Sequence, residues 1–285
     1  MDRYSEARRV ALWGIGANIV LLIIKLIVGF ISKSQAMIAD GFNSAGDVFA
    51  SIMTLTGNRI SNMPEDKDHP FGHGKAEYVF SMIISFSLLL ITYEILKSAI
   101  ESIISRRSFT FSWWLVGVAV ITILLKTALW IYTHRVGKRW NNLLIFANSE
   151  DHRNDILVTS GTLAGIIFGT GKLYWLDGVI GIGISLWIGY TGIRIFVSAY
   201  NVLMDTNMDD KLMERLQNEI ESIPGVDHVD SISAKPIGVS FIIIVKVSVA
   251  GSMTVEAGHA VAAQIKERIK GNKNVGDVLV HVNPC

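Results

Sequence analysis

The sequence contains little cysteine and little charge. Among its 285 residues there is one cysteine, Cys285, and only 18% of the residues are Asp, Glu, Lys or Arg. A lone cysteine excludes an internal disulfide and gives no metal or redox motif. Soluble domains carry about 25% charged residues, so a chain that is 50% hydrophobic and so lightly charged is not expected to be soluble, disordered or fibrous. A net charge of +1 indicates no nucleic-acid partner.

Long apolar runs are concentrated in the first 205 residues. A helix needs about 20 mostly apolar residues to cross the core of a bilayer. Six such helices are expected, at residues 10–31, 36–60, 78–104, 113–132, 143–168 and 174–203. Residues 1–205 are therefore predicted to form an all-α membrane bundle, and residues 206–285, whose composition is ordinary, a separate domain.

Lys and Arg are distributed unevenly between the two sets of helix ends. The set that includes the N-terminus carries more of them, among them Arg8, Arg59 and Arg135, than the set that includes Lys33 and Lys172. Because cytoplasmic ends carry the excess of Lys and Arg, the N-terminus is expected in the cytoplasm. With six crossings the C-terminus lies there too, as in a six-pass protein of a prokaryotic cell membrane.

The last 80 or so residues have the pattern of a small cytoplasmic α+β domain. Its elements are expected in the order helix, strand, strand, helix, strand, at residues 209–222, 226–234, 240–249, 255–269 and 275–282, with a turn at 236–238. A module of this size holds little core alone, so we expect it to pair with a second copy in a homodimer.

Polar side chains within two of the expected membrane helices indicate a cation site. Asn43 and Asp47 are four residues apart, as are Asp151 and Asp155, so each pair shares one helix face. Ionisable groups inside a bilayer are costly and therefore point to function. Three carboxylates and an amide oxygen are ligands for a hard divalent cation. His152 is rotated by about 100° from its neighbour and is expected to be adjacent rather than a ligand.

Two further features of the first 205 residues are less specific. Asp66, His69 and His73 form a D-x-x-H-x-x-x-H pattern in the loop after the second helix, which is either a second divalent-metal site or an ordinary polar loop. Three lysines, Lys25, Lys97 and Lys126, lie near or within expected membrane helices. They are expected to reach the interface or face the bundle interior, and no role is assigned to them.

The combination of these features resembles the cation diffusion facilitator (cation efflux) family. The loop H-x-x-G-H-G-K-x-E, from His69 to Glu77, and the order of elements carry the resemblance, which covers essentially the whole chain. It implies a homodimeric secondary transporter, not an enzyme, that exports divalent metal from the cytoplasm in exchange for protons by alternating access.

The resemblance also implies a metal preference. Zinc-transporting members have D-x-x-x-D and H-x-x-x-D where this chain has Asn43, Asp47, Asp151 and Asp155, a pattern similar to that of manganese-transporting members. An all-oxygen ligand set suits Mn²⁺, whereas Zn²⁺ gains from imidazole or thiolate. Mn²⁺ is therefore the expected substrate and protons the counter-substrate, with Fe²⁺ or Zn²⁺ as alternatives.

The resemblance assigns lesser roles to other residues. Asp66, His69 and His73 match the family's second metal position. Lys75 and Asp205 match a charge pair where the membrane helices join the C-terminal domain, which we call the tail. The tail metal positions correspond to Asp230, Lys246, His259, His281 and Asn283. Because Lys246 places a cation there, two metals are not expected, and Asp230, His259 and His281 are left as ligands for at most one.

Function classes other than transport are weighed against this interpretation. A membrane metallohydrolase requires a nucleophile or a water-activating site, and no such group of residues is evident. A membrane metal sensor that binds without transporting remains an alternative. Metal uptake into proteoliposomes separates a sensor from a transporter.

Overall fold

The computed structural model describes residues 3–31, 35–105, 113–168, 174–206, 209–238, 240–272 and 275–285. The chain divides into two compact units. The first comprises Met1–Asn62 and Ala76–Tyr200, and the second comprises Met63–Lys75 and Asn201–Cys285. The loop that carries Asp66, His69 and His73 therefore belongs to the same unit as the C-terminal domain.

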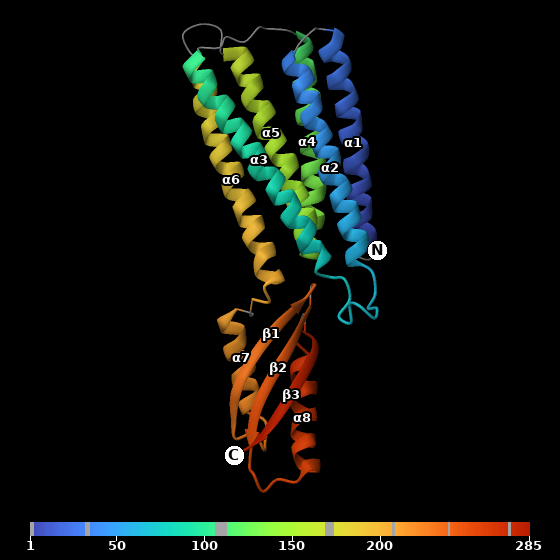
Figure 1. Ribbon diagram of the computed structural model, residues 1–285, viewed down its shortest axis with the longest axis vertical. Coiled ribbons are helices and arrows are strands. Elements are labelled where there is room, and N and C mark those ends of the chain that lie inside the picture. Colours follow the sequence, from blue (N-terminus) through green and yellow to red (C-terminus); the bar gives the residue numbers. More distant parts are fainter. Residues whose placement is uncertain are drawn as a thin grey trace. The chain divides into compact units, whose positions relative to one another are not determined.

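The first unit is a bundle of long helices (Figure 1). They are α1 (Arg3–Ile31), α2 (Gln35–Ser61), α3 (Ala76–Ser105), α4 (Trp113–Trp140), α5 (Leu143–Phe168) and α6 (Tyr174–Leu203). Among the described residues, α1, α3, α4 and α6 contain stretches long and apolar enough to cross a membrane. The helices α2 and α5 carry the polar residues singled out in the sequence, so their crossing of the bilayer stays a prediction.

Close packing positions α2 against its neighbours. A Cβ added at Gly57 of α2 would lie 2.7 Å from Leu144 Cδ2 of α5 and 2.8 Å from Phe80 Cβ of α3. Such contacts are shorter than a normal carbon–carbon approach of about 3.5–4.0 Å, so only glycine fits there. Small residues bring membrane helices together in this way. The convergence of α2, α3 and α5 fixes the two helices that carry the acidic pairs.

Polar contacts join the helices at one end of the bundle. Glu77, at the start of α3, is 1% exposed and accepts hydrogen bonds from the Arg3 side chain and from the Leu143 backbone N–H at 2.8 Å. Trp140 Nε1, at the end of α4, donates to Glu6 Oε2 of α1 at 2.5 Å. These contacts connect α1, α3, α4 and α5 at their termini.

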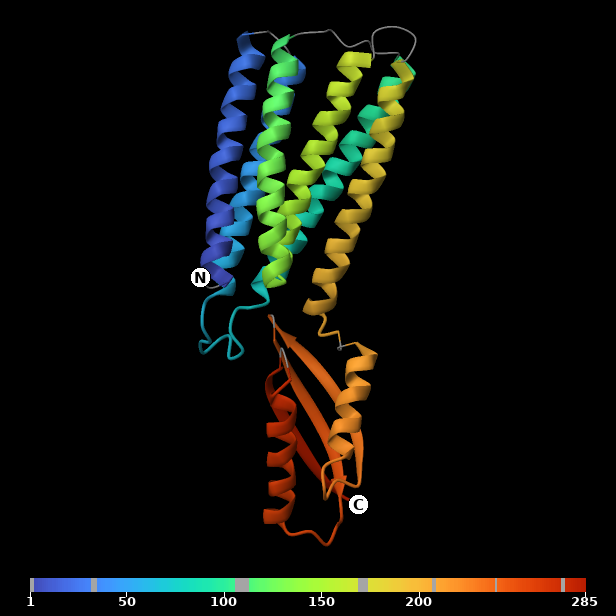
Figure 2. The same ribbon diagram turned by 180° about the vertical axis from the view of Figure 1, so that it is seen from behind.

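The second unit contains a small α+β domain. Its elements are α7 (Asp210–Glu221), β1 (His228–Ile237), β2 (Ser240–Val249), α8 (Val255–Lys270) and β3 (Val275–Pro284). The sheet has the order β1-β2-β3, with β1 and β2 antiparallel and β2 and β3 parallel. Figures 1 and 2 show α7 and α8 on the same face of the sheet.

Local sequence accounts for the limits of these elements. The Asp209 side chain accepts from the Lys211 N–H at the start of α7, and the Thr254 side chain accepts from the Ala257 N–H at the start of α8, as N-cap residues do. Strand β1 extends to Ile237, and the hairpin turns at Gly238, which has a positive φ of 60°. The expected turn at 236–238 is therefore shorter than predicted, because Pro236 still pairs with Phe241.

The core of this domain lies between the sheet and its two helices. Its most deeply buried side chains are Leu216 and Ile220 of α7, Ile243, Val245 and Val247 of β2, and Ile265 and Ile269 of α8. Apolar residues at i and i+4 on each helix produce the buried faces. The domain thus has a contiguous hydrophobic core.

Candidate metal centre

The acidic pairs of α2 and α5 meet around a lysine from α4. Lys126 is 0% exposed, and its Nζ donates to Asp47 Oδ2 at 2.8 Å and also to Asp155 Oδ2. Asp47 is 3% exposed. The Asp155 side chain is 14% exposed. Carboxylates from two helices are therefore directed at one buried point, where an ammonium group lies between them.

Asp151 and His152 extend the cluster along α5. One potential ligand atom from each of Asp151, His152 and Asp155 lies within 4.8 Å of the others. Asp151 Oδ2 and both ring nitrogens of His152 are buried and make no hydrogen bond in the part of the chain that the structure describes. Buried polar atoms are normally paired, so these three atoms of Asp151 and His152 are available as ligands for a cation.

Sequence reasoning placed His152 beside the site and not in it. The rotation of about 100° between successive helical residues separates Cα positions, but the structure brings an imidazole nitrogen within reach of the carboxylates of Asp151 and Asp155. Asp47 is not part of that group and is connected to it through Lys126. The backbone of Asn43 belongs to α2, but its side chain lies outside the described residues.

Lys126 is the residue whose place in the site sequence reasoning missed. The sequence did contain an indication that Lys126 is functional, because a charged side chain within an apolar membrane helix is costly and marks a functional position. Its helix, α4, carries no acidic residue, and the distance in sequence from Lys126 to Asp47 gave no reason to connect them. Only the packing of α4 against α5 and α1 makes the contact visible.

The residues of the loop pattern lie together within the second unit. The His69 backbone N–H donates to Asp66 Oδ1 at 2.6 Å, and His73 Nε2 lies 3.5 Å from Asp66 Oδ2. The hydrogen bond from the His69 backbone lowers the pKa of the Asp66 carboxyl, which keeps it ionised. One potential ligand atom from each of the three residues lies within 4.8 Å of the others. The D-x-x-H-x-x-x-H pattern therefore converges in space, at a surface where Asp66 and His69 are exposed.

Lys75 and Asp205 also meet within the second unit. Lys75 Nζ donates to Asp205 Oδ1 at 2.5 Å, and Lys235 Nζ lies 3.6 Å from Asp205 Oδ2. The hydrogen bond from Lys75 lowers the pKa of the Asp205 carboxyl. Asp205 has a positive φ of 55°, a backbone conformation that aspartate tolerates better than most residues.

The tail residues implied by the resemblance lie on or beside the three-stranded sheet, and some of them contact one another. Asp230 accepts hydrogen bonds from Asn283 at 2.9 Å and from Ser248 at 3.0 Å. His281 pairs in the sheet with Lys246. Within the described residues, Asp230, His259 and His281 do not form a group with metal-binding spacing. A metal at these three residues stays a prediction.

Sequence reasoning did not single out His228, which contacts Asp230. His228 Nε2 lies 3.1 Å from Asp230 Oδ1, and Nδ1 lies 2.7 Å from Asp227 Oδ2. The hydrogen bond with Asp227 raises the pKa of the His228 imidazole. The signal available in the sequence was the run of Asp227, His228 and Asp230 at the start of β1. Their contact favours a protonated imidazole between two carboxylates.

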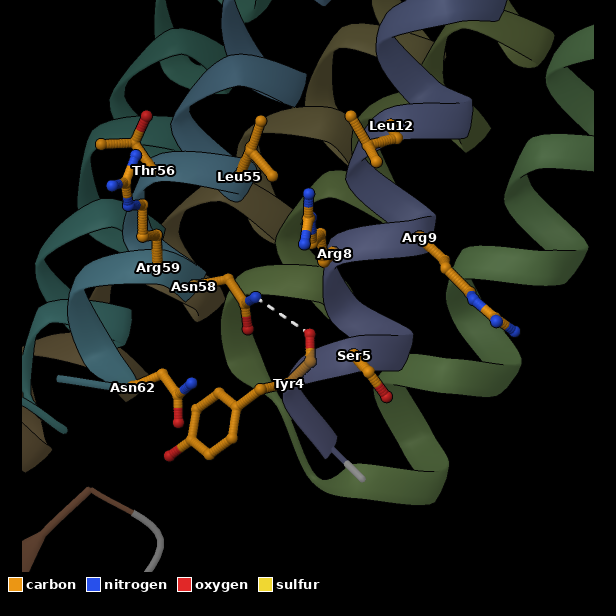
Figure 3. Close-up of a pocket in the computed structure, with 10 residues that line it drawn as sticks. All are labelled: Tyr4, Ser5, Arg8, Arg9, Leu12, Leu55, Thr56, Asn58, Arg59 and Asn62. Carbon is orange, nitrogen blue, oxygen red and sulfur yellow. Dashed lines mark hydrogen bonds between the residues drawn. The ribbon is translucent and has the colours of Figure 1, made fainter. Parts of the chain in front are cut away.

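A cavity between α1 and α2 is unsuited to a metal cation (Figure 3). It has a volume of about 980 Å³. Its lining consists of Tyr4, Ser5, Arg8, Arg9, Leu12, Leu55, Thr56, Asn58, Arg59 and Asn62. Three of these residues are arginines and none is acidic, so the cavity repels cations. The carboxylates around Lys126 are therefore the better candidate for a metal centre.

The two units together define a helical membrane protein with a buried acidic site and a small domain with a three-stranded sheet. Residues 11–204 match the family model of the cation efflux transmembrane domain, and residues 208–285 match that of the cation efflux protein cytoplasmic domain. The chain therefore belongs to the cation efflux family, as the sequence resemblance predicted.

Similar proteins cover the whole chain. It is 34% identical to the manganese efflux system protein MneS of Bacillus subtilis over 100% of this chain and 99% of the relative. It is 32% identical to the manganese efflux system protein MneP of the same organism over 99% and 98%. The magnetosome protein MamM of Paramagnetospirillum magneticum is 27% identical over 93% of this chain and 84% of its own length.

Proposed function

We propose that this member of the cation efflux family exports Mn²⁺ from the cytoplasm in exchange for protons. The observation that carries the proposal is the convergence of Asp47 and Asp155 from α2 and α5 on one buried point, beside Asp151. Carboxylate oxygens suit Mn²⁺ among the transition metals. The names of the relatives MneS and MneP support manganese as the metal.

Proton exchange follows from the charges of the site. Three carboxylates so close together cannot all remain ionised cheaply, so departure of a divalent cation favours the uptake of at least one proton. Metal release on one side is thereby coupled to proton entry from that side. The helices that carry the site are proposed to rock about it, which exposes it alternately to either face of the membrane.

The nitrogen of His152 bears on the choice of metal. Imidazole suits zinc and iron, so its presence within 4.8 Å of Asp151 and Asp155 keeps Fe²⁺ and Zn²⁺ as alternative substrates. The proposal for manganese rests on the predominance of oxygen ligands, to which Asn43 is proposed to add an amide oxygen. Because Mn²⁺ binds most weakly in the first-row series, ligand type must exclude zinc.

The proposed topology and assembly follow the sequence. Six crossings, with both termini in the cytoplasm, place the small domain on the side from which metal is collected. The family match of residues 208–285 bears the name of a dimerisation domain, which supports a homodimer. Asp66, His69 and His73 are proposed as an accessory metal site. Lys75 and Asp205 are proposed as an ion pair that holds the two protomers together at a hinge.

Transport by the Asp155→Ala variant tests the assignment of the site. Purified protein is reconstituted in vesicles with a pH gradient, and Mn²⁺ flux is recorded. Loss of a carboxylate that contacts the buried point is expected to reduce flux to background. The control is Glu214→Ala, which removes an exposed carboxylate on α7 and is expected to leave flux unchanged. Wild-type flux in Asp155→Ala would show that the site is assigned wrongly.

A further inference from the structure

The ammonium group of a lysine side chain occupies the position where the proposed function requires the transported metal ion. The Lys126 ammonium donates to Asp47 Oδ2 at 2.8 Å and to Asp155 Oδ2, and the side chain is 0% exposed. Asp47 belongs to α2, Asp155 to α5 and Lys126 to α4. One ammonium group therefore joins three helices through the carboxylates that are proposed to bind metal.

The arrangement differs from a simple structural ion pair. Burying an ammonium group carries a large desolvation cost, which only close and well-bonded carboxylates offset. A single partner would serve to neutralise Lys126, but this side chain bonds one carboxylate from each of the two acidic helices. Among the described residues, Asp47 lies outside the group formed by Asp151, His152 and Asp155, and the hydrogen bonds of this lysine connect it to Asp155.

A divalent cation and the ammonium cannot share these two carboxylates. Both are cations that would lie a few ångströms apart in a site of low dielectric, where charge repulsion is strong. Lysine has a long flexible stem whose charged end can move without any change in the backbone. When metal enters, the ammonium must therefore leave Asp47, Asp155 or both.

We propose that Lys126 is a tethered competitor of the transported metal. Its ammonium holds Asp47 and Asp155 when the site is empty, moves aside when a divalent cation binds, and returns as the cation leaves. This inference rests on the proposed function for the identity of the moving ion. The exchange of one cation for another needs no change in the protonation of Lys126.

The competitor lowers metal affinity and favours release. A transport site must bind its ion firmly enough to load it and weakly enough to let it go. An ammonium that replaces the departing metal compensates one of the three negative charges, so fewer buried charges remain for incoming protons to neutralise. Lys126 is thus a residue that sets affinity and turnover without itself being a ligand.

Two substitutions change, in opposite directions, how strongly residue 126 competes with metal for the carboxylates. Lys126→Met removes the charge and leaves an unbranched side chain one atom shorter, so Mn²⁺ binding is expected to tighten at least tenfold while turnover slows. Lys126→Arg keeps the charge and adds hydrogen-bond donors in a fixed fork that suits carboxylates. It is expected to weaken Mn²⁺ binding at least tenfold. Either variant alone tests the proposal if the other fails to fold.

The experiment is equilibrium binding of Mn²⁺ to the purified full-length protein, with its dissociation rate measured by rapid mixing with a chelator. Lys97→Met is the control, because it removes an exposed lysine of α3 and is expected to leave both quantities unchanged. The affinity order Met above Lys above Arg supports the proposal. Unchanged or weaker binding in Lys126→Met, or unchanged or tighter binding in Lys126→Arg, overturns it.

The same titrations with Zn²⁺ and Cd²⁺ distinguish failure of this inference from failure of the proposed function. If the wild type transports another divalent metal and not Mn²⁺, but the variants keep the same affinity order for that metal, the manganese assignment fails and the competitor stands. If Mn²⁺ is transported and the order is absent, the competitor fails and the proposed function stands.

Discussion

Gly57→Ala tests whether the packing of α2 against α5 fixes the distance between the acidic residues of these two helices. The substitution adds one methyl group at a position where Leu144 Cδ2 and Phe80 Cβ would lie at 2.7 and 2.8 Å. To restore a normal contact of about 3.5 Å, the neighbouring atoms must move by roughly 0.8 Å. Metal–ligand distances in a good site hold to within about 0.2 Å. A displacement of this size between the two acidic helices is expected to disturb the site.

Gly46→Ala is the matched control for this variant. Gly46 lies on the same helix, and a Cβ added there meets nothing within 4 Å. Both substitutions gain the same advantage in helix propensity, so the difference between them isolates overpacking. Overpacking of this kind typically costs about 1–3 kcal/mol. Gly57→Ala is therefore expected to be less stable than Gly46→Ala by about that amount.

The assays are equilibrium unfolding in detergent and Mn²⁺ binding. Changes in residues that support a metal site typically lower affinity about 10- to 100-fold, and a loss in that range is expected for Gly57→Ala alone. Equal stability and equal affinity in the two variants would refute the claim that contact at Gly57 positions the acidic helices.

Two further predictions concern the ligands and the tail. Asp151→His is expected to raise zinc flux relative to manganese flux in proteoliposomes, because imidazole suits Zn²⁺; an unchanged ratio counts against selection by ligand type. Asp227 raises the pKa of His228 above its ordinary 6.5, so the stability that His228 contributes is complete below pH 6.5 and is lost as the pH rises through the raised pKa. His228→Gln is therefore expected to lower the thermal unfolding midpoint of the full chain at pH 6 and not at pH 9, and a pH-independent difference contradicts this.

Local patterns predicted most of the secondary structure. The apolar runs correspond to the long helices α1 to α6, and the helices expected at residues 209–222 and 255–269 correspond to α7 and α8, which Asp209 and Thr254 cap. These features depend on hydrophobic spacing and on hydrogen bonds between residues a few positions apart. Sequence alone is sufficient for them because no distant part of the chain is involved.

The contacts between helices at the candidate metal centre were less predictable than the spacing of residues within one helix. Spacing of four residues correctly placed Asp151 and Asp155 together, but the contact of Lys126 with Asp47 and Asp155 depends on how α4 packs against the other helices. Rotation and proximity of separate helices are tertiary properties that one sequence does not specify. The C-terminal domain shows the same limit, since the contact between Asp230 and Asn283 depends on the pairing of strands distant in sequence.

Transport of a metal panel by the purified protein tests the central claim most directly. Proteoliposomes are supplied with Mn²⁺, Fe²⁺, Zn²⁺, Co²⁺ or Cd²⁺, with and without a proton gradient, and the accumulated metal and the internal pH are recorded. The account predicts that Mn²⁺ flux exceeds that of the other metals, depends on the gradient and is accompanied by opposite proton movement. Binding of Mn²⁺ without accumulation, or accumulation that is indifferent to the proton gradient, would contradict it.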